Sequence, residues 1–211
     1  MRCERCRLTV KSGVFRISVC VLIVLLSIAF LDRSVASYCD EHIRRGESWR
    51  YLNAFVSPLR LVVALSFAGF MIAGVKRVFG YPPCVVHRDA LLLTFGSLWA
   101  LAAETILKTA FGRSGTPAYL QDRAYEFHFF AGGGQFDSFP SGTALVSFTI
   151  ASLLSSTQSR YRYLGFIVAT SFSFTVILTN GHWVSDVIAG AFLGWLMGQI
   201  TFSFAYEQMK L

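Results

Sequence analysis

Residues 187–204 read VIAGAFLGWLMGQITFSF, an uninterrupted run without a charged side chain. A helix needs roughly 20 apolar residues to cross the hydrocarbon core of a bilayer, so this run has nearly the required length. Lipid offers the backbone no hydrogen-bond partners, and a lipid-embedded run is therefore expected to be helical. Five comparable runs occupy residues 14–31, 58–75, 90–107, 141–156 and 163–178. The pattern predicts an all-α, polytopic membrane protein with six transmembrane helices.

The composition favours the same class of protein. The chain has 211 residues, of which 54% are hydrophobic and 15% charged, whereas soluble domains usually carry about 25% charged residues. The length predicts one domain, in which residues 1–57 supply a first helix and an outer loop and residues 58–211 supply the other five helices and the site. The five cysteines show neither a disulfide framework nor the spacing of a zinc site. Nothing in the sequence indicates a cofactor.

The distribution of charge predicts how the chain crosses the membrane. Residues 1–13, 76–89, 157–162 and 205–211 together hold ten basic and three acidic residues, whereas the segments on the other side hold eight of each. Cytoplasmic loops carry the excess of lysine and arginine, so both termini are predicted inside and residues 108–140 outside. We expect an integral protein of a bacterial inner membrane with its site on the periplasmic side. The net charge of +7 is explained without nucleic acid.

The first apolar run allows an alternative interpretation. It follows a basic start and precedes small residues at 34–36, which is also the pattern of a cleavable signal peptide. The run is long for a signal peptide, so a retained transmembrane helix is favoured. Residues 32–57 would then form an outer loop.

The last run carries three glycines on one helix face, Gly190, Gly194 and Gly198. Small residues at this spacing allow another helix to approach closely. Packing within the chain is favoured over the alternative, a homo-oligomer joined through this face.

Three polar clusters adjoin the apolar runs at the predicted outer face. Residues 108–113 (KTAFGR) close the third run, residues 139–143 (FPSGT) open the fourth, and residues 180–186 (NGHWVSD) join the fifth to the sixth. The predicted topology brings all three to one side of the membrane, although they are far apart in sequence.

The first two clusters contain groups that can bind phosphate. Lys108 and Arg113 supply positive charge, and arginine adds a planar fork of donors for phosphate oxygens. Ser141 and Gly142 begin a helix after Pro140, where free backbone N–H groups and the positive end of the helix dipole favour an anion. The alternative is structural, with the two basic residues anchoring a helix at the headgroups and the serine capping the next one.

The third cluster contains a candidate nucleophile. The unprotonated ring nitrogen of His182 can attack phosphorus, and Asp186, four residues later, can hold the other nitrogen and fix the tautomer. The two residues could also be a buried hydrogen-bonded pair without catalytic turnover.

These clusters resemble the motifs of the type 2 phosphatidic acid phosphatases, K-x6-R-P, P-S-G-H and S-R-x5-H-x3-D, and the similarity covers roughly residues 58–204. The resemblance implies a six-helix membrane phosphatase that acts on phosphate-bearing lipids without a metal ion. It also implies that His182 is the nucleophile, which forms a phosphohistidine, and that Asp186 orients it. The phosphate cradle implied by the resemblance consists of Lys108, Arg113, Ser141, Gly142 and Thr143.

The chain departs from the family pattern at three places. Gly115 stands where the first motif has arginine, so Arg113 is a shifted candidate. Thr143 replaces the histidine that protonates the leaving group in the family, and Val176 replaces the arginine of the third motif.

The loss of the histidine bears on the substrate. Protonation of an alkoxide leaving group contributes about 10²–10⁴-fold to the rate, whereas a phosphate or an anomeric sugar oxygen needs it less. The expected substrate is therefore a lipid diphosphate or lipid phosphate similar to undecaprenyl diphosphate or lipid A phosphate. Two alternatives remain, a lipid phosphotransferase with the same site and a non-catalytic lipid-phosphate-binding or scaffold protein with a decayed site.

Two further residues are candidates for supporting roles. Glu104 lies inside a predicted span, four residues before Lys108, where an ionisable residue is usually paired. It is interpreted either as support for Lys108 or as part of a structural ion pair. His128, in the outer loop, is more typical of a solvated residue than of a substitute acid.

Overall fold

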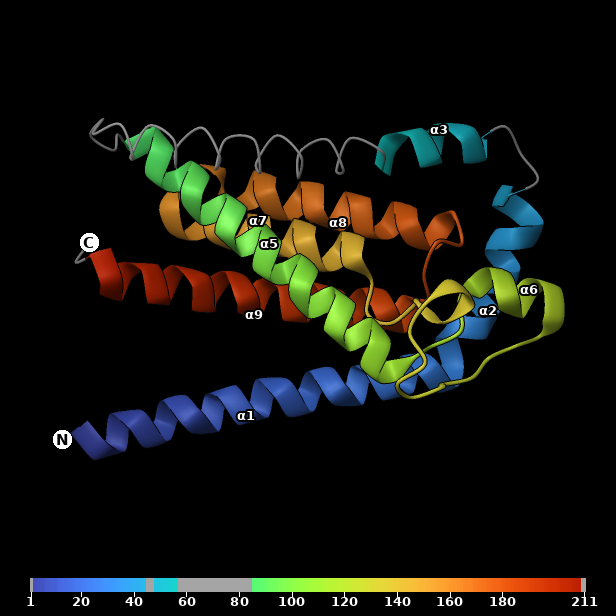
Figure 1. Ribbon diagram of the computed structural model, residues 1–211, viewed down its shortest axis with the longest axis horizontal. Helices are drawn as coiled ribbons and strands as arrows, with labels where there is room; N and C mark the ends of the chain where they lie inside the picture. The colour runs from blue at the N-terminus through green and yellow to red at the C-terminus, as the bar shows by residue number, and fades with distance from the viewer. Residues whose placement is uncertain (1, 45–47, 57–84, 210–211) are drawn as a thin grey trace.

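The computed structural model describes residues 2–44, 48–56 and 85–209, and this part of the chain is built of helices (Figure 1). The longer helices are α1 (Arg2–Leu26), α2 (Asp32–Cys39), α3 (Ser48–Val56), α5 (Val85–Phe111), α6 (Thr116–Asp122), α7 (Gly142–Thr157), α8 (Arg162–Leu178) and α9 (Val184–Met209). Short π-helical or 3₁₀ turns lie at Ser27–Leu31, Asp40–Arg44, Gly134–Phe136 and Ser159–Tyr161. Within the described ranges no residue belongs to a named strand, and the predicted all-α class is confirmed.

Three helical segments are long and apolar enough to cross a membrane, Gly13–Ile43, Asp89–Phe111 and Val184–Ala205. Two shorter apolar helices, α7 and α8, lie beside them. These five segments correspond to five of the predicted runs, and the chain is an integral membrane protein. The remaining run, at residues 58–75, lies outside the described residues, so the number six stays a prediction.

The part of the predicted outer loop (residues 32–57) that the structure describes is helical, over residues 32–44 and 48–56. The first helix does not end with its apolar run but continues through π-helical turns to Arg44, and α3 follows it. The apolar run used to predict this helix ends at residue 31, directly before Asp32. The helix continues because Asp32 is buried and paired inside the protein.

The core of the bundle lies where α7 packs against its neighbouring helices. Helix α7 packs most extensively on α9, then on α8 and α5. Ala100 of α5, Leu145 and Val146 of α7, and Met197 of α9 form the buried apolar cluster between three of these helices. Burial of such side chains fixes the relative positions of the helices that carry the polar clusters.

The glycine face of α9 is used in this packing. A Cβ added at Gly194 would collide with the backbone of Leu145, and one added at Gly190 or Gly198 would collide with Ser141 or Ser152. The three glycines therefore let α9 approach α7 at backbone distance. This face is covered by α7, which fits packing within the chain.

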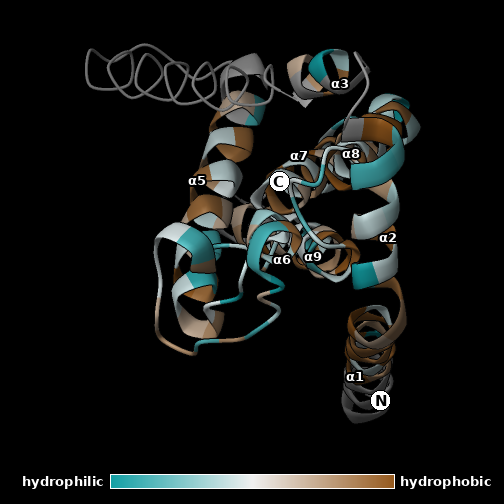
Figure 2. Ribbon diagram, turned by 90° about the vertical axis from the view of Figure 1, so that its right-hand side faces the viewer, coloured by the Kyte–Doolittle hydropathy of each residue, from teal (hydrophilic) through white to brown (hydrophobic). Residues whose placement is uncertain are grey.

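The polar loops gather at one end of the bundle. The C-terminal end of α5 and the starts of α7 and α9 lie there together with α2 and α6, whereas the start of α1 and the end of α9 lie at the opposite end (Figure 1). Figure 2 looks onto this end and shows hydrophilic colours on α6 and on much of the loops, against the largely hydrophobic α1. The long connection from α5 to α7 folds back on itself at Gly112, whose φ of +52° and contact with the carbonyl of His128 exclude any side chain.

Candidate active site

The three polar clusters meet at the loop-bearing end. Ser138 N donates to the carbonyl of Arg113 at 3.1 Å, and Ser141 N donates to the carbonyl of Asp186 at 3.1 Å. The first of these bonds joins the end of the α5 loop to the segment before α7, and the second joins the head of α7 to the head of α9. The convergence expected from the topology is therefore present in the fold.

His182 lies just before α9, with 17% of its side chain exposed. Its Nδ1 lies 2.9 Å from the carbonyl oxygen of Ser138. A carbonyl oxygen only accepts hydrogen bonds, so Nδ1 carries the proton and donates it. The other ring nitrogen, Nε2, then keeps its lone pair, which is the state that a nucleophile requires.

Asp186 stands behind this histidine and is fully buried. Its Oδ2 is 3.7 Å from His182 Nδ1, which is too long for a hydrogen bond. The same oxygen accepts a hydrogen bond of 2.6 Å from the hydroxyl of Ser138. Asp186 therefore does not make the predicted hydrogen bond to the His182 ring. It places a negative charge near the ring and binds the hydroxyl of Ser138, whose carbonyl accepts the hydrogen bond from the ring.

Arg113 does not lie in the position predicted for a phosphate ligand. Its side chain is 1% exposed, and its terminal nitrogens pair with Asp186 and, at 2.7 Å, with Asp32. Burial disfavours the charge of the guanidinium, but the carboxylates of Asp186 and Asp32 raise the pKa of Arg113 above its ordinary value. A guanidinium held between two buried carboxylates orients them and has little capacity left for a substrate.

Aromatic rings enclose this arginine. Its guanidinium carbon lies 5.0–5.4 Å from the ring centroids of Tyr125, Phe127 and Trp183, within the range of cation–π attraction. Arg113 Nη2 also donates to the hydroxyl of Tyr125 at 2.9 Å, and burial raises the pKa of this tyrosine, which stays protonated. The indole of Trp183 donates to the carbonyl of Ser114 at 2.8 Å and fixes the loop that carries the arginine.

The head of α7 carries groups that are able to bind an anion. Ser141 occupies the N-cap position, but its hydroxyl makes no capping bond. This hydroxyl is buried and has no hydrogen-bond partner among the described residues. Gly142 opens the helix and Thr143, which is half-buried, follows it. Unpaired N–H groups of the first turn together with an unsatisfied hydroxyl fit a phosphate oxygen.

Lys108 and Glu104 form the predicted ion pair, with 2.6 Å between Lys108 Nζ and Glu104 Oε1. The carboxylate of Glu104 also lies against Gly142, where any side chain would collide with it. An anion thus stands at the head of α7 beside the lysine that was predicted to bind phosphate. A phosphate at this position would displace the carboxylate of Glu104 and would contact Lys108 and the start of α7 in its place.

His128 lies on the exposed loop between α6 and α7. Its Nε2 is 2.8 Å from Glu126 Oε2, its ring packs on Phe136, and 43% of its side chain is exposed. These contacts fit a solvated loop residue. The described residues contain no group of three or more histidine, cysteine, aspartate or glutamate side chains arranged to hold a metal ion.

Four residues of the site were not predicted as site residues, namely Asp32, Tyr125, Ser138 and Ser185. Asp32 had one available signal, because it is an acidic residue directly after an apolar run. The serines and the tyrosine carry no such signal, since their roles depend on which loops meet in space.

An apolar groove adjoins the site. A hollow of about 560 Å³ opens between α1, the end of α5 and α9, and it is lined by apolar side chains that include Val24, Phe111, Phe139 and Phe192. Phe139 lies two residues before Ser141, so the groove runs from the head of α7 along the hydrocarbon-facing part of the bundle.

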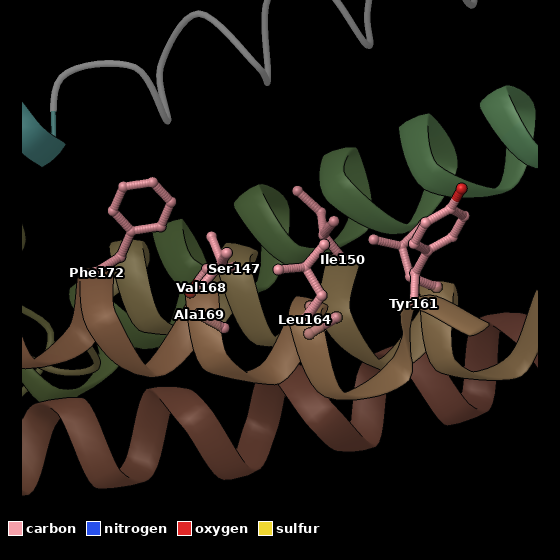
Figure 3. A pocket seen from close by; sticks show the side chains of 10 residues that line it. Ser147, Ile150, Tyr161, Leu164, Val168, Ala169 and Phe172 are labelled. Atoms are coloured by element: carbon pink, nitrogen blue, oxygen red, sulfur yellow. The ribbon is translucent and has the colours of Figure 1, made fainter. Parts of the chain in front are cut away.

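A second hollow is separate from the site. It measures about 350 Å³ and lies between α7 and α8, where Figure 3 shows Leu164, Val168 and Phe172 along one side. None of the site residues lines it. Of these two hollows, the groove beside Phe139 is the one that adjoins the site.

Comparison with known proteins identifies related sequences. The sequence pattern that defines the PAP2 superfamily matches residues 57–210. A lipid A 1-phosphatase of Rhizobium etli is 33% identical over 91 residues, which cover 43% of this chain and 39% of the relative. A lipid A 1-phosphatase of Porphyromonas gingivalis is 35% identical over 68 residues, or 30% of this chain and 15% of the relative. The chain thus spans less than half of the length of these relatives.

Two crystal structures share the fold. LpxE of Aquifex aeolicus superposes with a TM-score of 0.55 at 20% identity, covering 82% of this chain and 95% of that protein. The PAP2-type phosphatidylglycerolphosphate phosphatase of Bacillus subtilis superposes with a TM-score of 0.56 at 18% identity, covering 90% of this chain and 96% of that protein.

Proposed function

This chain belongs to the PAP2 superfamily, and we propose that it is a phosphatase that removes phosphate from a membrane lipid through a phosphohistidine on His182. The observation that carries the proposal is the 2.9 Å bond from His182 Nδ1 to the Ser138 carbonyl. This bond leaves Nε2 free to attack, at the end of the bundle where the head of α7 offers its anion-binding surface.

The proposed reaction has two steps. Nε2 of His182 forms a bond to phosphorus while the bond from phosphorus to the lipid oxygen breaks and the leaving oxygen takes a proton from solvent. Water then attacks the phosphohistidine and releases inorganic phosphate. Nδ1 keeps its proton throughout and donates it in a hydrogen bond to the Ser138 carbonyl. The positive charge that develops on the ring is stabilised by Asp186 Oδ2 at 3.7 Å from Nδ1.

Lipid A 1-phosphate is the substrate that we favour. Both sequence relatives are named lipid A 1-phosphatases. Attack on the phosphorus of a 1-phosphate releases the anomeric oxygen of the sugar, which is a weaker base than an ordinary alkoxide, and this fits a site with Thr143 in place of a histidine acid. A lipid diphosphate shares this property, and no metal ion or cofactor enters the proposed steps.

The test is a comparison of substrates with purified protein. Release of inorganic phosphate is measured from lipid A bearing its 1-phosphate, from undecaprenyl diphosphate and from phosphatidic acid. The first two are expected to react much faster than the third, because phosphatidic acid has an alkoxide leaving group. Equal rates for all three would contradict the leaving-group argument, and release from none would favour the non-catalytic alternative.

The groove beside Phe139 is proposed to hold a hydrocarbon chain of the substrate. A tryptophan at position 24 would fill part of it from α1. Val24→Trp is expected to raise KM for a long-chain lipid phosphate about tenfold, while kcat/KM for a water-soluble phosphate ester stays within about twofold, because remote binding energy is lost without disturbing the chemistry. Steady-state kinetics with both substrates measure this difference.

The matched control for the groove is Leu22→Trp. Leu22 lies on the same helix, is exposed and does not line the groove. Its replacement is expected to leave both KM values unchanged. Equal effects of the two tryptophans would mean that the groove does not hold the lipid.

The site is proposed to face the periplasm from a bacterial inner membrane, with both termini in the cytoplasm. The support is the charge asymmetry of the sequence. In a background without native cysteines, Gln121→Cys on α6 is expected to react with an impermeant maleimide in intact cells, and Arg160→Cys only after lysis. Both positions are exposed, and α6 lies at the end of the bundle opposite the turn that joins α7 to α8 (Figure 1). Labelling of both, or of Arg160→Cys alone, would overturn the orientation.

A further inference from the structure

We propose that Asp32, in the N-terminal helical segment, is a positioning residue of the active site. It lies outside residues 57–210, the part of the chain that matches the superfamily. The inference rests on the proposed function and extends it to a residue that none of the three motifs contains. Its carboxylate would hold Arg113 and the head of α9 in the arrangement that presents Asp186 and Ser138 to His182.

The contacts of Asp32 connect it to two parts of the site. Its Oδ2 pairs with Arg113 Nη2 at 2.7 Å and accepts from the hydroxyl of Ser185 at 2.5 Å. Its Oδ1 accepts from the backbone N–H of Ser185 at 3.0 Å. The carboxylate thus binds the α5–α7 loop and the first turn of α9 at the same time, with its side chain fully buried.

The chain of contacts continues to the nucleophile. Arg113, held by Asp32, pairs with Asp186 through its other terminal nitrogen. Asp186 in turn accepts from the hydroxyl of Ser138, whose carbonyl holds His182 Nδ1. A change at Asp32 therefore reaches the ring through four contacts between charged or hydrogen-bonded groups, of which the first three join buried side chains.

The charge balance of this cluster gives Asp32 a second effect. Two carboxylates share the single guanidinium of Arg113, so the cluster carries a formal excess of negative charge. When His182 bonds to phosphorus its ring becomes positively charged, and a negative neighbour in a buried site stabilises that charge. Without Asp32, the guanidinium would neutralise Asp186 alone and this stabilisation would weaken.

Other contacts show that the segment is built into the site. The side chain of Asn180 donates to the carbonyl of Ala36 at 3.1 Å, and the hydroxyl of Tyr125 lies 2.9 Å from the carbonyl of Ile28. Cleavage after residues 34–36 would remove Asp32 and both carbonyls. The retained helix, rather than the cleavable signal peptide, is the interpretation that fits the structure.

The experiment replaces one oxygen of the carboxylate. Asp32→Asn keeps the shape of the side chain and removes its charge, and Glu41→Gln makes the same change at an exposed position of the same segment. In single-turnover experiments, Asp32→Asn is expected to slow phosphohistidine formation about 10-fold to 10²-fold, as loss of an orienting carboxylate does behind other histidines. KM is expected to change less than about threefold, and Glu41→Gln is expected to match wild type.

A second measurement does not depend on activity. The ¹⁵N signals of the His182 ring, assigned with His182→Gln, report which nitrogen carries the proton. Wild type is expected to show the Nδ1-protonated tautomer, and Asp32→Asn a mixture of tautomers. Wild-type rate and ring signals in a folded Asp32→Asn protein would overturn the inference.

Two outcomes need separate treatment. If Asp32→Asn does not fold, Ser185→Ala, which removes a hydroxyl that contacts both Asp32 and Arg113, is expected to slow phosphohistidine formation about tenfold. An unchanged rate there would overturn the inference. If wild type acts on no lipid phosphate, the proposed function fails, and the ring signals alone decide the role of Asp32.

Discussion

Replacement of His182 by alanine is expected to lower the rate of phosphate release by about 10⁴-fold or more, because the reaction loses its nucleophile. The side chain is partly exposed at the end of the bundle, so the helices and their apolar packing should remain intact. Phosphate release measures the loss. Alkaline quenching of a reaction with ³²P-labelled substrate, followed by gel analysis, should reveal a labelled wild-type protein and an unlabelled variant.

The control is another histidine on the same side of the bundle. His42 is exposed and stacks on Tyr38 at the C-terminal end of the first helical segment. His42→Ala is expected to keep wild-type activity and labelling. More than about 1% residual activity in a well-folded His182→Ala protein would exclude the phosphohistidine mechanism.

Replacement of Thr143 by histidine is expected to raise the rate for phosphatidic acid about 10²-fold, the low end for a positioned acid. The position lies in the first turn of α7, one residue after Gly142 and beside the proposed cradle. A histidine there could protonate the leaving alkoxide, whose charge develops only in the transition state. Substrates with good leaving groups should gain little, so the ratio of kcat/KM values between the two classes is the measurement.

Two companion variants define this test. Thr143→Asn introduces a polar side chain without a useful acid and is expected to show no selective gain. His128→Ala tests whether the loop histidine already serves as a substitute acid, and it is expected to leave both rates unchanged. A wild-type protein that cleaves phosphatidic acid as fast as lipid A 1-phosphate would show that the leaving-group argument is wrong.

Much of the architecture could be predicted from the sequence because lipid imposes a simple rule. Runs of apolar residues must be helical, and the helices α5, α7, α8 and α9 begin and end within a few residues of the predicted runs. Charges at the run boundaries predicted which loops share a side. Ser141, Gly142, His182 and Asp186 could be proposed as site residues because helix starts and histidine–carboxylate spacing have local sequence signals.

The partners of these residues could not be predicted in the same way. The sequence predicts Arg113 as a phosphate ligand, because an arginine beside such a motif usually binds an anion. In the structure its guanidinium instead pairs with the two buried carboxylates of Asp32 and Asp186. One of them, Asp32, lies 81 residues away in sequence. The Ser138 carbonyl that holds His182 belongs to the backbone, which no side-chain motif can reveal. Such contacts depend on how the loops fold over the helix ends.

The close approach of α9 to α7 has a consequence for motion during turnover. The first turn of α7, which is proposed to bind the phosphate, and His182, the proposed nucleophile, lie at one end of this helix pair, whose backbones approach closely at Gly190 and Gly194. Helices packed this closely cannot slide past each other without collision, so we expect α7 and α9 to behave as one rigid unit. Any closure around a lipid headgroup is then expected to move the end of α5, which carries Lys108, and the loop that follows it.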